Sequence, residues 1–484
     1  MRSIGYCLVT VSAVFSGGLR AAADDTTPPK DAAEKPNVIF VMADDLGYGD
    51  LGCYGQAQIQ TPNIDRMAAE GMRFTNYYAG STVCAPSRCV LMTALHTGHC
   101  YIRGNSKWNL RIGDVTVGEV AQKAGYKTGA FGKWGLGHEN SGGHPFVQGF
   151  HEFYGYLDQH HAHNYYPTFL IRNLEREPLT NVVPDEGKYG QGVASEKNEY
   201  SHDLIFAEAL QFIDKYKDDP FFLYLPFTIP HANNEAGKAG MEIPGYGIYA
   251  DEDWPEPQKG LAAMITRLDT DMELLFLKLQ EHNLDEKTLV FFTSDNGPHA
   301  EGGNDPEFFN SNGPLRGKKR DLYEGGIRVP MIARWPGRIE AGSETDHVSS
   351  HADLMATFGE LASAFYPSGF DGVSFAPTLL GESDSQQRHE YLYWEFHEGK
   401  FAQAVRMGKW KAIRYLTDNA TVELYDLEAD LGEEKNVADE HASIAARLCE
   451  VMDQAHKPSR EWPIDPSKRP AAPEPRPRPT PKRN

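Results

Sequence analysis

Two short acidic segments contain the residue types that bind a hard metal ion. Asp44 and Asp45 follow one run of apolar residues, and Asp295 and Asn296 follow another. Carboxylate and carboxamide oxygens are the ligands that Ca²⁺ and Mg²⁺ prefer, whereas zinc and copper sites usually contain softer ligands. An isolated Asp-Asp pair more often forms a solvated turn or a helix cap. Because both pairs end apolar runs, the sequence favours a metal site over that alternative.

A candidate nucleophile lies in the segment 84–88, which reads Cys-Ala-Pro-Ser-Arg. Pro86 and Ser87 suit the first turn of a helix, so residue 84 would lie at the helix N-terminus. Unpaired backbone N–H groups gather there, and Arg88 adds a full positive charge one turn later, so this position favours an anion. An isolated cysteine is more often a buried thiol or half of a disulfide. The surrounding motif favours a reactive Cys84 instead.

These segments together resemble the type I sulfatase family. In that family the cysteine of a C-x-P-S-R motif is oxidised after translation to formylglycine, whose hydrated aldehyde attacks the sulfur of a sulfate ester. The resemblance implies that Cys84 is modified to formylglycine and that a formylglycine-generating maturation enzyme is a partner of the chain. It covers residues 37–328 as ordered motifs, and residues 423–436 resemble the family's C-terminal element.

The resemblance also implies a bound divalent cation, with calcium as the expected ion and magnesium as the alternative. Such an ion would neutralise sulfate oxygens and stabilise the charge that moves as the S–O bond breaks. The positions that correspond to the family's metal ligands are Asp44, Asp45, Cys84, Asp295 and Asn296.

Four basic residues have implied catalytic roles beside Cys84. Arg88 and Lys133 supply positive charge for the sulfate, and His231 contacts the ester or protonates the leaving oxygen, as suits a side chain whose ordinary pKa is near neutral. Lys319 corresponds to the lysine that holds the sulfate and assists the departing alkoxide, with Lys318 as the alternative. Outside these motifs, Lys133 would more simply be a surface lysine and His231 a structural histidine.

Gly135 departs from the family pattern. Many sulfatases read G-K-W-H-L-G here, and this chain reads G-K-W-G-L-G. The family histidine interacts with the formylglycine. Its function is therefore either absent here or supplied by a nearby residue, for which the sequence offers His138, His160, His161 and His163.

An expected loop at residues 160–167 concentrates histidine and tyrosine. Loops on a rigid scaffold commonly determine specificity, and aromatic faces with polar edges suit sugar rings. We predict that His161 and His163 bind a sulfated carbohydrate together with Lys133, His231 and Lys319. A packed structural loop is an equal alternative.

The predicted function is hydrolysis of a sulfuric ester of a carbohydrate, or of an aryl sulfate. One alternative is a phosphate or phosphonate monoester hydrolase, because relatives of this fold share the cation site. The other is a non-catalytic glycan-binding protein with an unmodified Cys84.

Strands and helices alternate along most of the chain, which predicts an α/β fold with a large, mostly parallel sheet between helices. The resemblance implies that this fold is alkaline phosphatase-like. Ligand sites in such sheets form at the carboxyl ends of strands, where the motifs lie. The expected strands are 37–42, 128–131, 220–227, 288–293 and 329–334, and the expected helices are 64–70, 117–124 and 261–282.

From residue 389 the pattern changes to short strands and one helix, which predicts a smaller antiparallel sheet with a covering helix. The first residues have the order of a secretory signal peptide, and no later segment has the ~20 apolar residues of a membrane helix. We therefore predict a secreted or periplasmic protein without a membrane span. The predicted parts are signal peptide 1–23, linker 24–35, catalytic domain 36–388, C-terminal α+β subdomain 389–465 and disordered Pro-rich tail 466–484.

Charge and cysteine content bear on partners and on compartment. The formal net charge of −21 argues against a nucleic-acid partner. Six cysteines are present, and Cys7 would leave with the signal peptide, so five would remain. An odd number agrees with separate chemistry at Cys84, and Cys89 with Cys100 is a candidate disulfide that the sequence leaves open.

Overall fold

The computed structural model describes residues 35–399, 401–416 and 421–472. The predicted signal peptide, nearly all of the predicted linker and the tail from residue 473 lie outside the described residues. Pro466–Lys468 forms a 3-10 turn, and the Arg469 guanidinium donates a 2.6 Å hydrogen bond to the His397 carbonyl. The division between two domains at residue 388 stays a prediction.

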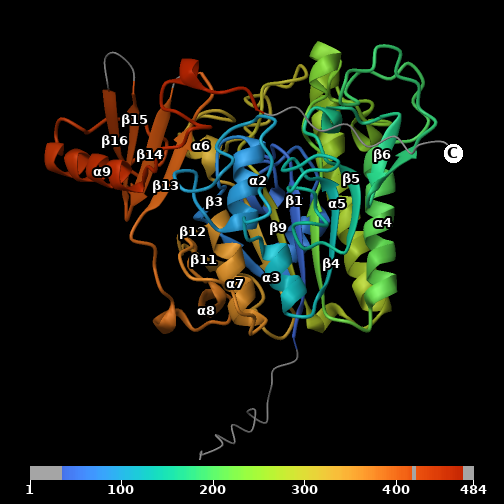
Figure 1. Cartoon of the computed structure of the whole chain (residues 1–484), viewed down its shortest axis with the longest axis horizontal. Coiled ribbons are helices and arrows are strands. Elements are labelled where there is room, and N and C mark those ends of the chain that lie inside the picture. Colours follow the sequence, from blue (N-terminus) through green and yellow to red (C-terminus); the bar gives the residue numbers. More distant parts are fainter. Residues whose placement is uncertain (1–34, 400, 417–420, 473–484) are drawn as a thin grey trace, which may run out of the picture. The chain divides into compact units, whose positions relative to one another are not determined.

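One large sheet organises the main body (Figure 1). Its five central neighbours, β9, β1, β8, β4 and β5, all pair in parallel, and antiparallel strands flank them on both sides. The predicted α/β fold with a mostly parallel sheet is confirmed. Among the described residues the strand order is β11 (Ser343–Thr345), β2 (Met72–Phe74), β10 (Met331–Arg334), β9 (Thr288–Ser294), β1 (Asn37–Ala43), β8 (Phe221–Pro226), β4 (Lys127–Lys133), β5 (Glu152–Tyr156), β6 (Phe169–Arg172) and β7 (Glu175–Pro178).

Helices cover both faces of this sheet, which explains why its central strands are apolar throughout. Side chains alternate along β1, so Ile39 and Val41 join one hydrophobic core while Phe40 and Met42 join the other. The first core contains α1 (Pro62–Glu70), α4 (Ser201–Tyr216) and α5 (Glu256–Glu281), and the second contains α2 (Cys84–Thr93), α3 (Val117–Lys123) and α7 (Leu354–Leu361).

A separate antiparallel sheet of four strands follows in the chain, as predicted, and α9 packs on β14, β15 and β16 (Figure 1). Its other face packs against the main body, where Trp394 donates a 2.9 Å hydrogen bond to the Ala79 carbonyl and shares a core with Val83. The elements are β13 (Leu392–Phe396), β14 (Ala402–Met407), β15 (Trp410–Tyr415), β16 (Thr421–Asp426) and α9 (Ala442–Ala455).

The remaining short elements complete the main body. None of the helices that the structure describes combines the length and the apolar composition needed to cross a membrane. All five cysteines within the described ranges are free, including Cys89 and Cys100. The short elements are β3 (Tyr77–Tyr78), β12 (Ser349–Ser350), α6 (Glu324–Ile327) and α8 (Ala376–Leu379).

Glu395 of β13 ties the small sheet to the main body. Its buried carboxylate accepts a 2.9 Å hydrogen bond from His397 and lies 3.3 Å from Nη1 of Arg103, which belongs to the segment after α2. Burial would raise its pKa, but hydrogen bonds from His397 and His456 and the charge of Arg103 lower the pKa of Glu395 to about 2. The ionised form therefore stabilises the folded state.

We predict that Glu395→Gln lowers the free energy of unfolding at pH 7 by on the order of 3 kcal/mol, as the lowered pKa of this buried group implies. Because the folded-state pKa lies below the unfolded one, this contribution is complete above about pH 4.5 and is lost as the pH falls toward 2. Urea unfolding from pH 7 downward should show the difference between the two proteins narrowing.

Glu390→Gln is the matched control, because Glu390 is exposed just before the same strand. It should change the free energy of unfolding by less than about 0.5 kcal/mol at every pH. A difference between wild type and Glu395→Gln that stays constant with pH would contradict the assigned role.

Candidate active site

The parallel strands bring the predicted residues to one edge of the sheet. Asp44 and Asp45 follow β1, Asp295 follows β9, and Lys133 is the last residue of β4. His231 follows β8, which lies between β1 and β4 in the sheet. Parallel strands that are neighbours end at the same edge, so residues far apart in sequence meet there.

Asp44, Asp45 and Asp295 form a fully buried group that we call the carboxylate cluster. The Asp45 N–H donates a 3.1 Å hydrogen bond to Asp295, and the Asn296 amide donates a 2.6 Å bond to Asp45. Asp45 adopts a φ of 65°, a left-handed conformation that aspartate tolerates better than most residues.

The donor set of this cluster fits a hard cation. Asn296 Oδ1 is buried and has no hydrogen-bond partner among the described residues. Buried polar oxygens usually have a partner, so an unpaired one beside three carboxylates indicates a missing positive group. Oxygen ligands of this kind suit Ca²⁺ or Mg²⁺. Asp44, Asp45, Asp295 and Asn296 could hold such an ion.

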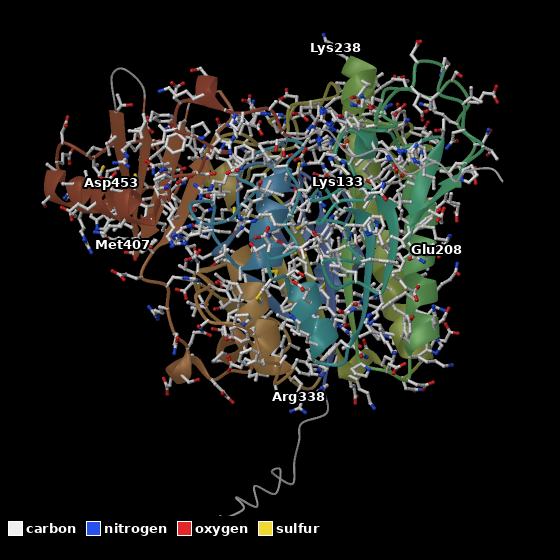
Figure 2. All side chains as sticks on the ribbon, in the orientation of Figure 1. Lys133, Glu208, Lys238, Arg338, Met407 and Asp453 are labelled. Atoms are coloured by element: carbon white, nitrogen blue, oxygen red, sulfur yellow. The ribbon has the colours of Figure 1, made fainter. Side chains whose placement is uncertain are left out.

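Three cations balance the carboxylate cluster, each through a different carboxylate. Lys133 Nζ lies 2.6 Å from Asp44, Lys319 Nζ lies 2.8 Å from Asp45, and Arg88 Nη2 lies 2.7 Å from Asp295. Figure 2 shows Lys133 in the interior of the main body, in agreement with its 1 % exposure. The adjacent Lys318 is exposed, so Lys319 is the lysine that enters the site.

The carboxylates of Asp44 and Asp295 differ in their pKa values. Burial would raise the pKa of Asp44, but the positive charges of Lys133 and Arg88 hold it well below its usual range. Burial and the repulsion from Asp44 raise the pKa of Asp295 to about 7, although Arg88 opposes this. Asp295 is therefore the carboxylate that would gain most from a further positive charge.

Cys84 is the first residue of α2 and faces the carboxylate cluster. Its Sγ lies 3.3 Å from Asp44 Oδ1 and 4.0 Å from Asp45 Oδ1. Burial and the charge of Asp44 raise the pKa of the Cys84 thiol well above its ordinary value. A thiol that stays protonated near neutral pH is a weak nucleophile, because the thiolate is the reactive form.

His231 and Lys319 form the outer part of the site. Lys319 Nζ donates a 3.1 Å hydrogen bond to His231 Nε2, and His231 Nδ1 donates a 2.6 Å bond to the Ala232 carbonyl. These partners assign the proton to Nδ1. Burial and the charge of Lys319 lower the pKa of His231 well below its ordinary value, so the imidazole is neutral with its Nε2 lone pair toward Lys319.

The structure separates the four histidines that could compensate for Gly135. Gly135 has a φ of 75°, and a Cβ there would lie 3.2 Å from Gln159 Cγ. His163 stacks on His231 with ring centroids 5.1 Å apart, and its Nδ1 lies 3.1 Å from a Glu235 carboxylate oxygen. Of the four, His163 is therefore the one that contacts a predicted catalytic residue.

The other three histidines pack elsewhere. His161 is 2 % exposed and its ring lies against Phe169 at 4.4 Å, so the expectation that it contacts substrate finds no support in its position. His138 and His160 each lie 3.5 Å from Asp158.

One site residue, Glu301, was not predicted from the sequence. Glu301 Oε2 lies 3.1 Å from Lys319 Nζ and 3.7 Å from His231 Nε2, and Glu301 Oε1 accepts a hydrogen bond from Arg320. Glu301 follows Asp295 by six positions, and this proximity was the available signal. Glycines and acidic residues around it made the segment look like an ordinary surface loop.

Comparison with known proteins agrees with this geometry. The family model described as Sulfatase matches residues 36–364, which include every residue of the site. The chain belongs to the sulfatase family. A second model, described as N-sulphoglucosamine sulphohydrolase, C-terminal, matches residues 317–458 of this sulfatase. The protein is a sulfuric ester hydrolase.

Similar proteins extend over most of the sulfatase chain. Arylsulfatase A of Homo sapiens is 32 % identical over 476 residues, which cover 87 % of each chain. The N-acetylgalactosamine-6-O-sulfatase of Bacteroides thetaiotaomicron is 30 % identical over 87 % of this chain and 93 % of its own. A solved structure of Ps i-CgsB in complex with k-i-k-neocarrahexaose has a TM-score of 0.72 and 27 % identity, covering 90 % of this chain and 96 % of that one.

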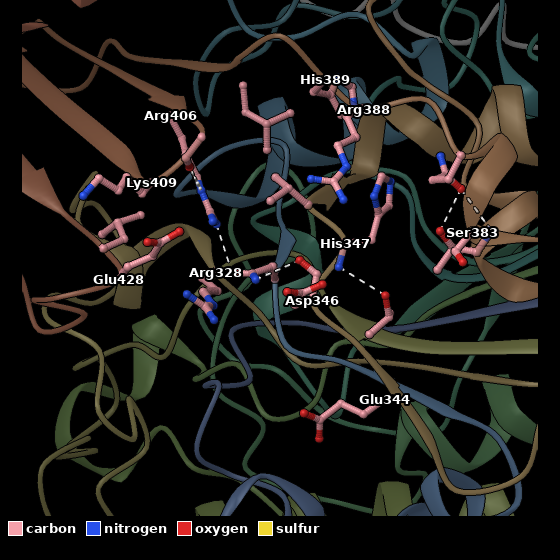
Figure 3. A pocket seen from close by; sticks show the side chains of 18 of the residues that line it. Arg328, Glu344, Asp346, His347, Ser383, Arg388, His389, Arg406, Lys409 and Glu428 are labelled. Carbon is pink, nitrogen blue, oxygen red and sulfur yellow. Dashed lines mark hydrogen bonds between the residues drawn. The ribbon is translucent and has the colours of Figure 1, made fainter. Parts of the chain in front are cut away.

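A cavity of about 640 Å³ lies beside the small sheet of this sulfatase (Figure 3). Arg406 of β14 and Lys409 of the turn that follows it line this cavity, and Arg328 lines it from the main body. Arg328 is paired with Glu324 at 3.2 Å, and Arg406 donates a 3.0 Å hydrogen bond to Asn76. The described residues that line this cavity include none of the carboxylate cluster. The cluster at the sheet edge is therefore the candidate active site.

We predict that Arg88→Met lowers the free energy of unfolding by about 3–5 kcal/mol, because a buried carboxylate would lose its partner. Arg88→Lys, which keeps the charge, should lose less. Urea unfolding in the presence of a chelator measures both. Arg66→Met replaces an exposed arginine and should change the value by less than about 0.5 kcal/mol. An Arg88→Met variant as stable as wild type would contradict the charge balance described above.

Proposed function

We propose that this sulfatase removes sulfate from a sulfated carbohydrate and that formylglycine made from Cys84 is its nucleophile. The observation that carries the proposal is the position of Cys84 at the start of α2, 3.3 Å from Asp44 Oδ1. Its raised thiol pKa makes an unmodified cysteine a poor nucleophile and so favours modification. The names of the Bacteroides relative and of the neocarrahexaose complex support a carbohydrate substrate.

The proposed cation is calcium, with magnesium as the alternative. When bound, it would neutralise sulfate oxygens beside the group formed from Cys84. Its proposed protein ligands are Asp44, Asp45, Asp295 and Asn296, together with the modified residue 84. The unpaired Oδ1 of Asn296 and the raised pKa of Asp295 support a positive charge at this point.

The basic residues of the site have separate proposed roles. Lys133 and Lys319 are proposed to contact sulfate oxygens, since they lie at the cluster and pair with Asp44 and Asp45 respectively. His231 is proposed to interact with the leaving oxygen through Nε2, and Lys319 beside it would stabilise the alkoxide. Arg88 is fully buried behind the carboxylates and is proposed to hold their positions.

His163 is proposed to take part in substrate binding because it stacks on His231. Export to the periplasm or the medium, a maturation enzyme as partner and the domain division 36–388 and 389–465 remain part of the proposal. They rest on the composition of the sequence and on the family resemblance.

The mass of the peptide that contains residue 84 tests the nucleophile. After expression with a maturation enzyme, we expect the mass of the aldehyde or its hydrate, and activity on an aryl sulfate in proportion to the modified fraction. Cys84→Ala should abolish turnover, whereas Cys449→Ala, at a partly exposed site distant in sequence, should retain it. Full activity with an unmodified thiol would refute the mechanism.

Paired aryl sulfate and aryl phosphate substrates test the reaction class. We expect kcat/KM to favour the sulfate, because the chain belongs to the sulfatase family. A clear preference for the phosphate would favour the monoester hydrolase alternative. Glycan binding without hydrolysis by fully modified protein would favour the non-catalytic alternative.

Calcium should stabilise the protein in a way that requires the carboxylate cluster. Free calcium at about 100 times its Kd should add about 2.7 kcal/mol to the free energy of unfolding, because it binds the folded state. Asp45→Asn should lose most of this increment, whereas Asp185→Asn, at an exposed position, should keep it. Thermal unfolding with calcium and with a chelator measures the increment, and an unchanged increment in Asp45→Asn would contradict the assigned ligands.

A further inference from the structure

Glu301 lies at the outer end of the active site and is held there from two sides. Lys319 approaches one carboxylate oxygen from within the site at 3.1 Å, and Arg320 donates to the other oxygen from the solvent side. The Lys319 side chain is 3 % exposed and that of Arg320 is 46 % exposed. Lys319 and Arg320, which are adjacent in the sequence, thus each bind one oxygen of the Glu301 carboxylate.

The backbone of Arg320 is left-handed, which allows the adjacent side chains of Lys319 and Arg320 to bind the same carboxylate. Its φ of 79° is uncommon for a residue with a side chain, and its N–H donates a 3.1 Å hydrogen bond to the Thr82 carbonyl. Strained conformations of this kind persist where the surrounding structure holds them, and they concentrate at functional sites. The position of Glu301 is therefore fixed relative to Lys319 and His231.

Glu301 still has acceptor capacity that no described side chain uses. A carboxylate accepts about four hydrogen bonds, and Lys319 and Arg320 account for one each. The side chain is 18 % exposed, so part of it faces solvent. Burial would raise its pKa, but the positive charges of Lys319 and Arg320 hold the pKa of Glu301 far below its usual range, so it is ionised.

Two cations in this part of the molecule form ion pairs with further acidic residues. Arg320 lies 3.7 Å from Glu398, and Lys107 lies 2.6 Å from Asp158. A second anionic group on the substrate would therefore meet an ionised carboxylate at Glu301, and these neighbouring cations already have partners. A hydroxyl group, in contrast, could donate a charge-assisted hydrogen bond to Glu301.

We propose that Glu301 determines specificity: it favours a leaving group with a free hydroxyl beside the sulfated carbon and disfavours one with a second sulfate at that neighbouring position. This inference rests on the proposed function, because it places the leaving oxygen near His231 and Lys319. Glu301 lies 3.7 Å from His231 Nε2. A hydroxyl on the adjacent carbon would then come within hydrogen-bond reach of the carboxylate.

The test compares leaving groups that differ only at the neighbouring position. The aryl series is phenyl sulfate, 2-hydroxyphenyl sulfate and benzene-1,2-diyl disulfate, and the sugar pair is N-acetylgalactosamine 4-sulfate and its 3,4-disulfate. The readout is kcat/KM of the modified wild-type enzyme, Glu301→Gln and Glu307→Gln. Glu307 is an exposed glutamate in the same loop, so the control removes the same charge.

We expect wild type to prefer each hydroxyl-bearing substrate over its disulfate, and Glu301→Gln to reduce that ratio at least tenfold. Glu307→Gln should leave the ratio unchanged. A ratio that Glu301→Gln does not alter would overturn the inference, and so would an equal loss on every substrate, which would make Glu301 a positioning residue for Lys319. A wild-type enzyme that hydrolyses none of these sulfates would instead overturn the proposed function.

Discussion

The active site depends on the balance of charge in a fully buried space. The carboxylate cluster removes three acidic groups from water, which is unfavourable unless positive charges and hydrogen bonds offset the loss. Arg88, Lys133 and Lys319 supply those charges, each to a different carboxylate. The unpaired oxygen of Asn296 and the raised pKa of Asp295 indicate that the balance is still short of positive charge. Because each carboxylate already has a cationic partner, a divalent cation bound here would leave a net positive charge, and that charge would favour an anionic substrate.

The rest of the fold keeps this arrangement in place. Parallel pairing of β9, β1, β8 and β4 sets the spacing of the residues at their ends. The small sheet supports the start of α2 from outside, since Trp394 bonds to Ala79 and shares a core with Val83, the residue before Cys84. Glu395 and Arg103 add a buried ion pair between the sheet and the segment after α2. The C-terminal part thus stabilises the position of Cys84 without contributing to the carboxylate cluster.

An acidic protein can bind an anion because electrostatic interactions at contact distance outweigh the diffuse field of distant charges. The formal net charge is −21, yet the innermost side chains that face Cys84 include the ammonium groups of Lys133 and Lys319. At the outer end of the site the side chains are acidic. Glu301 lies beside His231, and Glu235 lies beside His163, which stacks on His231. The site is therefore positive where a sulfate would be held and acidic around the group attached to it.

The sequence by itself predicted five strands of the large sheet, the long helix α5, the small antiparallel sheet and the residues of the metal and sulfate motifs. Apolar runs and local motifs consist of consecutive residues, so they can be recognised without the fold. It did not reveal α4, α7 or the strands β5 to β7, whose patterns are weaker or shorter. Only the tertiary structure decided that Lys319 faces inward, that His163 stacks on His231 while His161 is buried, and that Glu301 joins them. Those contacts connect segments separated by many residues, and their geometry comes from chain packing, which no local pattern encodes.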